Sequence, residues 1–151
     1  MINIIRTSSD NPDFIRLVKS LDAELAERDG IEHSFYKQFN QIENLKYCIV
    51  AYADIVLAGC GALKEYAPET MEIKRMFTSP SSRNKGIGSK ILATLEEWAR
   101  ELSYEKCILE TGKKQPEAIR LYEKCGYLQI PNYGQYAGVE NSICFEKKLY
   151  E

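Results

Sequence analysis

The sequence is poor in the residues that build metal centres and catalytic triads. Its 151 residues include one histidine, His33, and five cysteines without a CxxC pair. A histidine-based zinc site would need distant cysteine ligands, and a Ser-His-Asp triad would have to use this single histidine. Both kinds of site are therefore disfavoured, and we expect no metal. The cysteines are odd in number, widely spaced and mostly within or beside apolar segments, which predicts reduced and mostly buried thiols. They are Cys48, Cys60, Cys107, Cys125 and Cys144.

The sequence also lacks an excess of positive charge and a long apolar run. Its formal net charge is -2, whereas nucleic-acid binding usually draws on clustered Lys and Arg. No run of about 18 apolar residues is present to span a bilayer, and the first residues, MINIIRTSSDNPDF, lack the pattern of a signal peptide. We therefore expect no nucleic-acid partner, no membrane partner and a cytoplasmic location.

The composition is that of one globular domain. Hydrophobic residues make up 44% and charged residues 28%, and the length suits a single domain over residues 1–151. Apolar periodicity and turn residues predict the order β, α, α, β, β, β, α, β, α, β, β. Strands are expected at 2–7, 47–52, 55–63, 71–77, 106–112 and 141–149, with one more near the end. Helices are expected at 13–30, 31–39, 87–102 and 115–127.

The strand MEIKRMF carries side chains of two kinds that should alternate between two faces. The odd-numbered residues from Met71 to Phe77 are expected on one face and the even-numbered residues on the other. This alternation predicts that Glu72 and Met76 lie on the same side of the sheet.

A glycine pair, Gly86 and Gly88, stands immediately before the most regular apolar stripe of the sequence. Glycine permits a positive φ and close approach of a ligand, and backbone N–H groups converge where a helix begins. With Arg83 and Lys85 nearby, this loop suits a phosphate group. Neither the dinucleotide fingerprint nor the P-loop motif fits the letters. A plain strand-to-helix turn is the alternative.

The segment RNKGIGSKIL resembles the acyl-CoA binding motif, R/Q-x-x-G-x-G/A, of the GCN5-related N-acetyltransferase superfamily, with Arg83, Gly86 and Gly88 at its defining positions. MEIKRMFTSP looks like the family's fourth strand, and AIRLYEKCGY looks like its second helix on the coenzyme side. The resemblance spans nearly the whole chain. It implies an α/β (α+β) fold whose mixed, mostly antiparallel sheet has six to seven strands, helices on both faces, and a splay between the fourth and fifth strands.

The resemblance implies that acetyl-CoA is the co-substrate. Its pantetheine arm would lie between the splayed strands and hydrogen-bond the backbone of Met76, Phe77 and Thr78. Gln115 stands near the position of an asparagine that is frequent in the family, and it would either contact the arm or belong to a helix cap before Pro116. The loop amides would bind the pyrophosphate: Arg83, Asn84, Lys85, Gly86, Ile87, Gly88 and Ser89.

The resemblance also assigns the acid and the base of a direct acetyl transfer. An amine must lose a proton before or during its attack on the thioester, and Glu72 is the expected base, with Glu110 in reserve. The alternative for Glu72 is a strand-surface carboxylate paired with Lys74 or Lys106. Tyr122 matches the tyrosine that family members use as general acid towards the leaving thiolate. Its alternative role is that of a core tyrosine on an amphipathic helix.

The acceptor is expected to be a small molecule or amino acid with a primary amine, and the protein is expected to form a homodimer, as is common in the family. Three alternatives remain open: acetylation of a protein or peptide amine, a non-catalytic CoA-binding sensor, and an acyl relay through Cys60 or Cys107. The resemblance implies that the acceptor pocket involves the first helices and the last strands. Its candidate residues are Glu32, Phe35, Tyr36, Glu110, Tyr133 and Tyr136.

Overall fold

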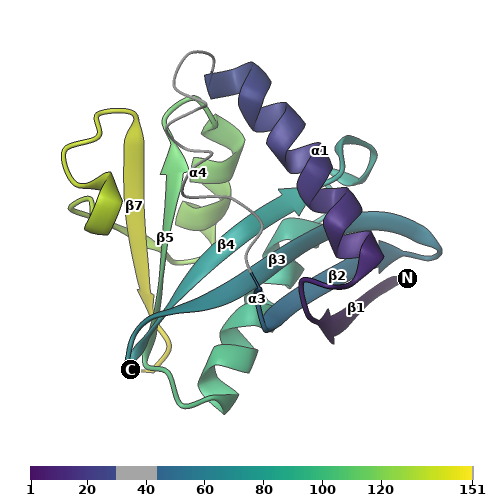
Figure 1. Ribbon diagram of the computed structural model, residues 1–151, viewed down its shortest axis with the longest axis horizontal. Helices are drawn as coiled ribbons and strands as arrows, with labels where there is room; N and C mark the ends of the chain where they lie inside the picture. The colour runs from purple at the N-terminus through teal and green to yellow at the C-terminus, as the bar shows by residue number, and fades with distance from the viewer. Residues whose placement is uncertain (30–43, 151) are drawn as a thin grey trace.

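The computed structural model describes residues 1–29 and 44–150, and the helix expected at 31–39 lies outside the described residues. The elements follow the predicted order along the rest of the chain (Figure 1). The strands are β1 (Ile2–Thr7), β2 (Tyr47–Ala53), β3 (Val56–Ala67), β4 (Thr70–Thr78), β5 (Lys106–Gly112), β6 (Leu128–Ile130) and β7 (Ser142–Lys148). The helices are α1 (Pro12–Asp29), α3 (Ile87–Glu101) and α4 (Pro116–Lys124), with short 3-10 turns η2 (Pro80–Ser82) and η3 (Gly134–Tyr136).

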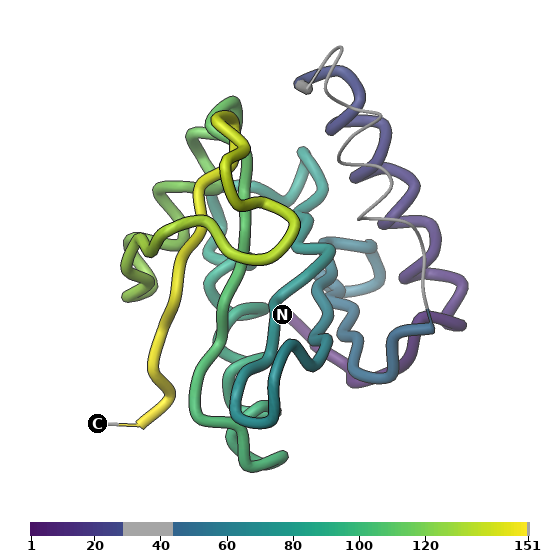
Figure 2. The backbone as a smooth tube through the Cα atoms, turned by 60° about the vertical axis from the view of Figure 1, so that its left-hand side comes forward, coloured from purple at the N-terminus to yellow at the C-terminus, as the bar shows by residue number. Residues whose placement is uncertain are grey.

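The seven strands form one sheet in the order β1-β2-β3-β4-β5-β7-β6. Neighbouring strands are antiparallel except for β4 and β5, which are parallel. Helices cover both faces, with α1 in front of the sheet and α3 behind it in Figure 1. Figure 2 shows α1 and β7 at opposite sides of the molecule. The predicted mixed, mostly antiparallel sheet with helices on both faces is confirmed.

Each face of the sheet has its own apolar core. Helix α3 buries a stripe that includes Ile87, Ile91 and Leu95, and α4 packs against the same core. Helix α1 begins after Asn11, whose side-chain oxygen accepts a hydrogen bond from the backbone N–H of Asp13 at 2.8 Å, an ordinary N-cap. None of the helices in residues 1–29 and 44–150 is long and apolar enough to cross a membrane.

The strict alternation predicted for β4 is wrong in the second half of the strand. The pairing of β3 with β4 shifts register between Cys60 and Ala62, because β4 contains an extra residue there. Arg75 accommodates the shift with a φ of 58°, in the left-handed region. Met71 packs in the core under α3, whereas Phe77 packs in the core under α1. The bulge therefore reverses the facing of the residues that follow it.

The bulge also separates Glu72 from Met76, which were expected on one side. A Cβ at Gly61 would lie 2.9 Å from the Met76 sulfur, and Met76 packs against the core under α3. Arg75 instead contacts Asp22 of α1, with Nη1 2.9 Å from Oδ1. The residues on either side of Glu72 in β4 pack in the core under α3, so Glu72 points to the opposite face. Glu72 and Arg75 therefore share the face covered by α1.

Strands β4 and β5 make a fork. They pair only over Thr70 with Lys106, Met71 with Cys107, and Glu72 with Ile108. Beyond Glu72 they separate, so the predicted splay between the fourth and fifth strands is confirmed. The backbone edges that face each other past this point are available to a ligand.

Candidate functional site

The loop before α3 forms one end of the site. Gly86 precedes the helix with a φ of 76°, and no side chain caps the first turn. A Cβ at Gly86 would meet no atom within 4 Å, so the space beside this backbone is open. The first amides of a helix lack partners within it and carry the positive end of its dipole. The geometry suits an anionic group at this position.

A groove of about 540 Å³ runs over this loop, between the end of β4 and α4. Leu21, Glu24 and Arg28 of α1 line it as well. Lys85 is exposed beside the groove. The predicted cofactor-binding residues that line it are Met76, Phe77, Thr78, Arg83, Asn84, Gly86, Ile87, Gly88, Ser89 and Gln115.

Gly88 has a role different from that of Gly86. It lies in the first turn of α3, and a Cβ there would come within 3.0 Å of a methyl group of Leu121. The missing side chain thus lets α4 pack closely against the start of α3. The first glycine of the pair shapes the loop and the second joins the two helices on either side of the groove.

The Arg83 guanidinium is held by protein groups. Its Nε donates to the carbonyl oxygen of Thr78 at 2.9 Å, and Nη2 lies 2.8 and 3.0 Å from the two carboxylate oxygens of Glu24. These contacts tie the loop to the end of β4 and to α1. Arg83 therefore positions the loop amides. The sequence motif alone contained no sign of the Glu24 contact.

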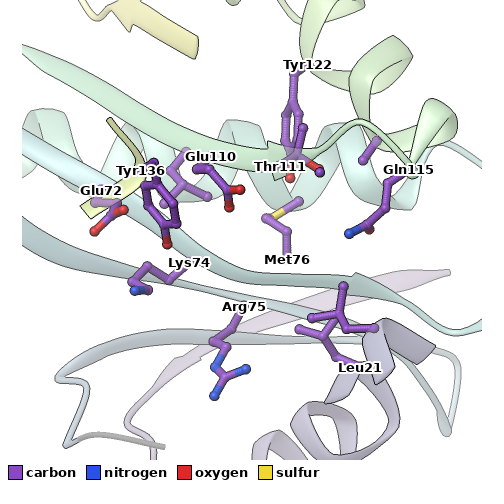
Figure 3. A pocket seen from close by; sticks show the side chains of 14 residues that line it. Leu21, Glu72, Lys74, Arg75, Met76, Glu110, Thr111, Gln115, Tyr122 and Tyr136 are labelled. Carbon is purple, nitrogen blue, oxygen red and sulfur yellow. The ribbon is translucent and has the colours of Figure 1, made fainter. Parts of the chain in front are cut away.

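A second cavity of about 100 Å³ lies in the fork between β4 and β5 (Figure 3). Glu72 is placed where the strands part, and its residue exposure is only 7%. The hydroxyl of Tyr133 donates to a carboxylate oxygen of Glu72 at 2.7 Å. Burial and the charge of Glu72 raise the pKa of Tyr133, so this hydroxyl keeps its proton and remains a donor. A surface pairing of Glu72 with Lys106 does not occur, because Lys106 instead contacts Glu146 at 3.0 Å.

Tyr122 enters the fork from α4. It lines both the cavity and the groove, and its residue exposure is 6%. Its ring packs edge-on against Tyr127, with 6.0 Å between centroids, and its hydroxyl end points toward Thr111 and Met76 in Figure 3. Burial, with the charge of Glu110 adding to it, raises the pKa of Tyr122. A buried phenol of this kind is protonated at neutral pH.

The remaining predicted acceptor residues divide into two groups. Glu110 and Tyr136 line the fork cavity, and the rings of Tyr133 and Tyr136 meet at right angles with centroids 5.8 Å apart. Tyr133 contacts Glu72 and Tyr136 lines the cavity, so both C-terminal aromatics lie at the fork. The others lie outside the described residues: Glu32, Phe35 and Tyr36.

The cysteines are mostly buried, as predicted, with only Cys125 half-buried. Burial raises the pKa of Cys48 and Cys107 to about 12 and that of Cys144 to about 11, and it raises the pKa of Cys60 as well. A thiol with such a pKa is a poor nucleophile at neutral pH because the thiolate is the reactive form. An acyl relay through Cys60 or Cys107 is therefore disfavoured. Within the described ranges, no three His, Cys, Asp or Glu side chains are placed to hold a metal ion.

Sequence reasoning missed Arg75 and two leucines of α1 as residues of the site. Arg75 lines the fork cavity, as do Leu21 and Leu25 of α1. The resemblance implied that the first helices take part in the acceptor pocket, but it did not single out these leucines. An arginine on the strand face predicted for Met71, Ile73 and Phe77 was the signal that could have drawn attention to Arg75.

The geometry agrees with comparisons to known proteins. The sequence profile of the acetyltransferase (GNAT) family matches residues 14–127. The N-acetyltransferase YsnE of Bacillus subtilis is 40% identical over 95 residues, which span 62% of this chain and 63% of that protein. An IAA acetyltransferase of Azospirillum brasilense is 29% identical over 154 aligned residues, 98% of each chain.

Solved structures share the fold along the whole chain. A crystal structure described as an acyl-CoA N-acyltransferase from Klebsiella pneumoniae has a TM-score of 0.83 at 27% identity, covering 99% of both chains. PaiA N-acetyltransferase from Thermoplasma acidophilum, solved in complex with coenzyme A, has a TM-score of 0.72 at 21% identity and covers 98% of this chain and 99% of its own.

Proposed function

The chain belongs to the acetyltransferase (GNAT) family and is an acetyl-CoA-dependent acetyltransferase, and we propose that its acceptor is the primary amine of a small molecule or amino acid. One observation carries this proposal. Glu72 and Tyr122 approach a single cavity from different elements, at the fork of β4 and β5. That cavity shares Met76, Gln115 and Tyr122 with the groove that leads to the glycine loop.

The groove fits coenzyme A at both ends. The open, uncapped amides after Gly86 suit the pyrophosphate, and the unpaired edges of β4 and β5 suit the amides of the pantetheine arm. Arg83, held by Glu24 and the Thr78 carbonyl, keeps the loop in this shape. Bound acetyl-CoA supplies the acetyl thioester at the fork.

Glu72 acts as the base in this proposal. Its carboxylate accepts the proton that the ammonium of the acceptor must lose, directly or through one water, so that the nitrogen lone pair can form the new C–N bond. Tyr133 holds the carboxylate in one orientation through its hydroxyl. Tyr133 is thus a positioning residue.

Tyr122 acts as the acid. When the C–S bond breaks, its hydroxyl donates a hydrogen bond, and then its proton, to the departing sulfur. A free thiol has a pKa of about 8.5, below that of a buried phenol, so full proton transfer requires that burial in the fork raise the pKa of the thiol too. Ile73, Ala118 and Met76 add apolar side chains to the lining of this cavity.

The experiment is a thiol-release assay with acetyl-CoA and a panel of free amino acids, polyamines, aminoglycosides, peptides and IAA. Release above the hydrolysis background with a free amino acid or another small amine supports the proposal. Peptides outperforming every free amine would assign the protein-acetylating alternative. Stabilisation by CoA without release across the whole panel would assign the sensor alternative.

The homodimer and the cytoplasmic location are also proposals. The family resemblance supports a dimer formed through the last strands, and light scattering of the purified protein measures its mass in solution directly. A monomeric mass would remove the dimer from the account.

A further inference from the structure

Glu110 lies further into the fork than Glu72 does. Cys107 and Leu109 of β5 pack in the core under α3. Since side chains alternate along a strand, Glu110 points to the opposite face, where Glu72 also lies. The last residues that pair β4 with β5 are Glu72 and Ile108. Glu110 comes two residues later, about 6.6 Å further along its strand, where the two strands have already separated.

Glu110 is also the carboxylate nearer to Tyr122. In the view of Figure 3 its carboxylate lies between Glu72 and Tyr122. Burial and then the charge of Glu110 raise the pKa of Tyr122, whereas burial and then the charge of Glu72 raise the pKa of Tyr133. The two carboxylates of the cavity therefore lie beside different hydroxyl groups. Glu72 contacts the positioning residue Tyr133, and Glu110 lies towards the proposed acid.

The basic side chains of the cavity lie away from Tyr122. Besides the two glutamates, the charged residues that line the cavity are Lys74 and Arg75. In Figure 3 the Arg75 guanidinium points towards α1, and the nitrogen of Lys74 also lies away from Tyr122. Glu110 therefore supplies the negative charge at this end of the cavity. The other labelled residues near Tyr122 in that view are uncharged: Met76, Thr111 and Gln115.

The reaction needs a negative charge beside the thioester. An alkyl amine has a pKa near that of lysine, about 10, so it arrives as an ammonium ion at neutral pH. Its nitrogen must come within about 3–3.5 Å of the carbon that is bonded to the departing sulfur. Moving a cation from water into a partly buried cavity is costly unless a carboxylate pairs with it. The carboxylate nearer to Tyr122 is the better placed for this pairing, because Tyr122 protonates that sulfur in the proposed mechanism.

We propose that Glu110 binds the ammonium of the acceptor beside the thioester and orients its nitrogen for attack. This inference rests on the proposed function and deepens it, because it gives the charged form of the acceptor a binding residue distinct from the base. The nitrogen loses two protons in all. One passes to Glu72 before the C–N bond forms. The other leaves as the amide forms and restores the proton that Tyr122 gives to the sulfur when the C–S bond breaks. Glu110 stays ionised throughout.

The test compares two amines of nearly the same shape in the thiol-release assay, after subtraction of the uncatalysed reaction. Ethylamine is an ammonium ion at neutral pH, whereas methoxyamine is uncharged. Glu110→Gln keeps the size of the side chain and removes its charge. It should raise KM for ethylamine about 10- to 100-fold, the loss of one charge-assisted hydrogen bond, and change KM for methoxyamine little. Its kcat should fall far less than that of Glu72→Gln.

Two further variants complete the comparison. Glu110→Asp keeps the charge on a shorter side chain and should recover part of the affinity for ethylamine. Glu146→Gln is the matched control, because Glu146 is a half-buried carboxylate of β7 that pairs with Lys106, outside the cavity lining. It should leave KM unchanged for both amines.

Two kinetic results would overturn the inference and leave the proposed function intact. Equal rises of KM for both amines in Glu110→Gln would show that the residue supports the structure of the cavity and does not bind the ammonium. A loss of kcat as large as that of Glu72→Gln, with KM unchanged, would make Glu110 a base.

If no amine releases thiol, the proposed function fails, and NMR titration of the CoA-bound protein still decides the inference. The side-chain carboxyl carbon of Glu110 is followed in protein labelled with ¹³C-glutamate, and its signal is identified by its absence in Glu110→Gln. The signal should shift on addition of ethylamine and not on addition of methoxyamine. A signal that stays in place, or that shifts equally with both amines, would contradict the inference.

Discussion

Among single residues, Tyr122 links packing to chemistry most closely. The helix α4 that carries it has Pro116 at its start and Gly126 just past its end, where the φ of 93° suits glycine. This fixed helix brings a buried hydroxyl to the fork. A core role and the proposed catalytic role are therefore combined in one side chain, because the buried ring supports the position of the hydroxyl.

Tyr122→Phe removes the hydroxyl and retains the ring. We expect kcat to fall about 100- to 10,000-fold, the usual contribution of a general acid, with little change in melting temperature. Steady-state kinetics and thermal unfolding measure the two effects. Tyr104→Phe is the control, since Tyr104 contacts Glu65 away from the fork. Full turnover in Tyr122→Phe would remove this residue from the mechanism.

The pH dependence of kcat follows from the raised pKa of Tyr122. The acid must be protonated to act, and burial favours the neutral phenol, so the active form persists above the ordinary tyrosine pKa of about 10. The rate profile should show no falling limb from this group below about pH 10. A falling limb centred well below that value and absent in Tyr122→Phe would contradict the assignment.

Among the elements, the loop before α3 and the bulge of β4 show how far a sequence can be read. The glycine pair and the regular apolar spacing after it predicted a loop followed by a helix, because helical periodicity is a local property. The bulge at Arg75 arises from pairing with β3 and from the contact with α1, which are non-local, and strict alternation therefore failed there. Glu24 was missed for the same reason: its contact with Arg83 links residues far apart in sequence.

Gly86→Ala tests the loop. A φ of 76° costs a residue with a Cβ about 1–2 kcal/mol, and the loop would relax away from its anion-binding shape. We expect a lower melting temperature and a several-fold higher KM for acetyl-CoA. Gly86→Asn is the matched control, because asparagine tolerates this conformation better. Equal effects of the two substitutions would show that the left-handed backbone is not what matters.

Helix α3 is fastened to the sheet by a buried polar cluster. Glu96, only 4% exposed, accepts hydrogen bonds from Lys147 Nζ of β7 and from the hydroxyl of Tyr127, both at 2.9 Å. Lys147 also donates to the carbonyl oxygen of Cys125 at 2.8 Å. The cluster ties together α3, the end of α4 and the last strand.

Glu96→Ala leaves the ammonium of Lys147 and the hydroxyl of Tyr127 without this acceptor. We expect the free energy of unfolding to fall by about 2–3 kcal/mol and the melting temperature by about 5–10 °C. KM for acetyl-CoA should stay close to wild type, since the cluster lies outside the groove. Glu101→Ala breaks an exposed pair with Arg6 and should change stability little. Equal losses in the two variants would contradict the structural role of Glu96.

For the molecule as a whole, the fold class, the order of elements along the chain and the fork were predictable because glycine loops, helix stripes and strand patterns carry the family resemblance along the chain. The candidate acid, base and coenzyme loop followed from the same resemblance. The acceptor was not predictable, since its cavity is assembled from α1, β4, β5 and the turn at Tyr136. Arg75 belongs to that assembly, and its contact with Asp22 of α1 is visible only in three dimensions.

The central claim is acetyl transfer from acetyl-CoA to an amine at the fork. It is tested most directly by mass spectrometry of the acceptor after incubation with acetyl-CoA labelled in the acetyl group. The account predicts a labelled N-acetyl acceptor, formed in the same amount as free CoA thiol and abolished in Glu72→Gln. Thiol release without a labelled acceptor, or a labelled acceptor at the wild-type rate in Glu72→Gln, would contradict it.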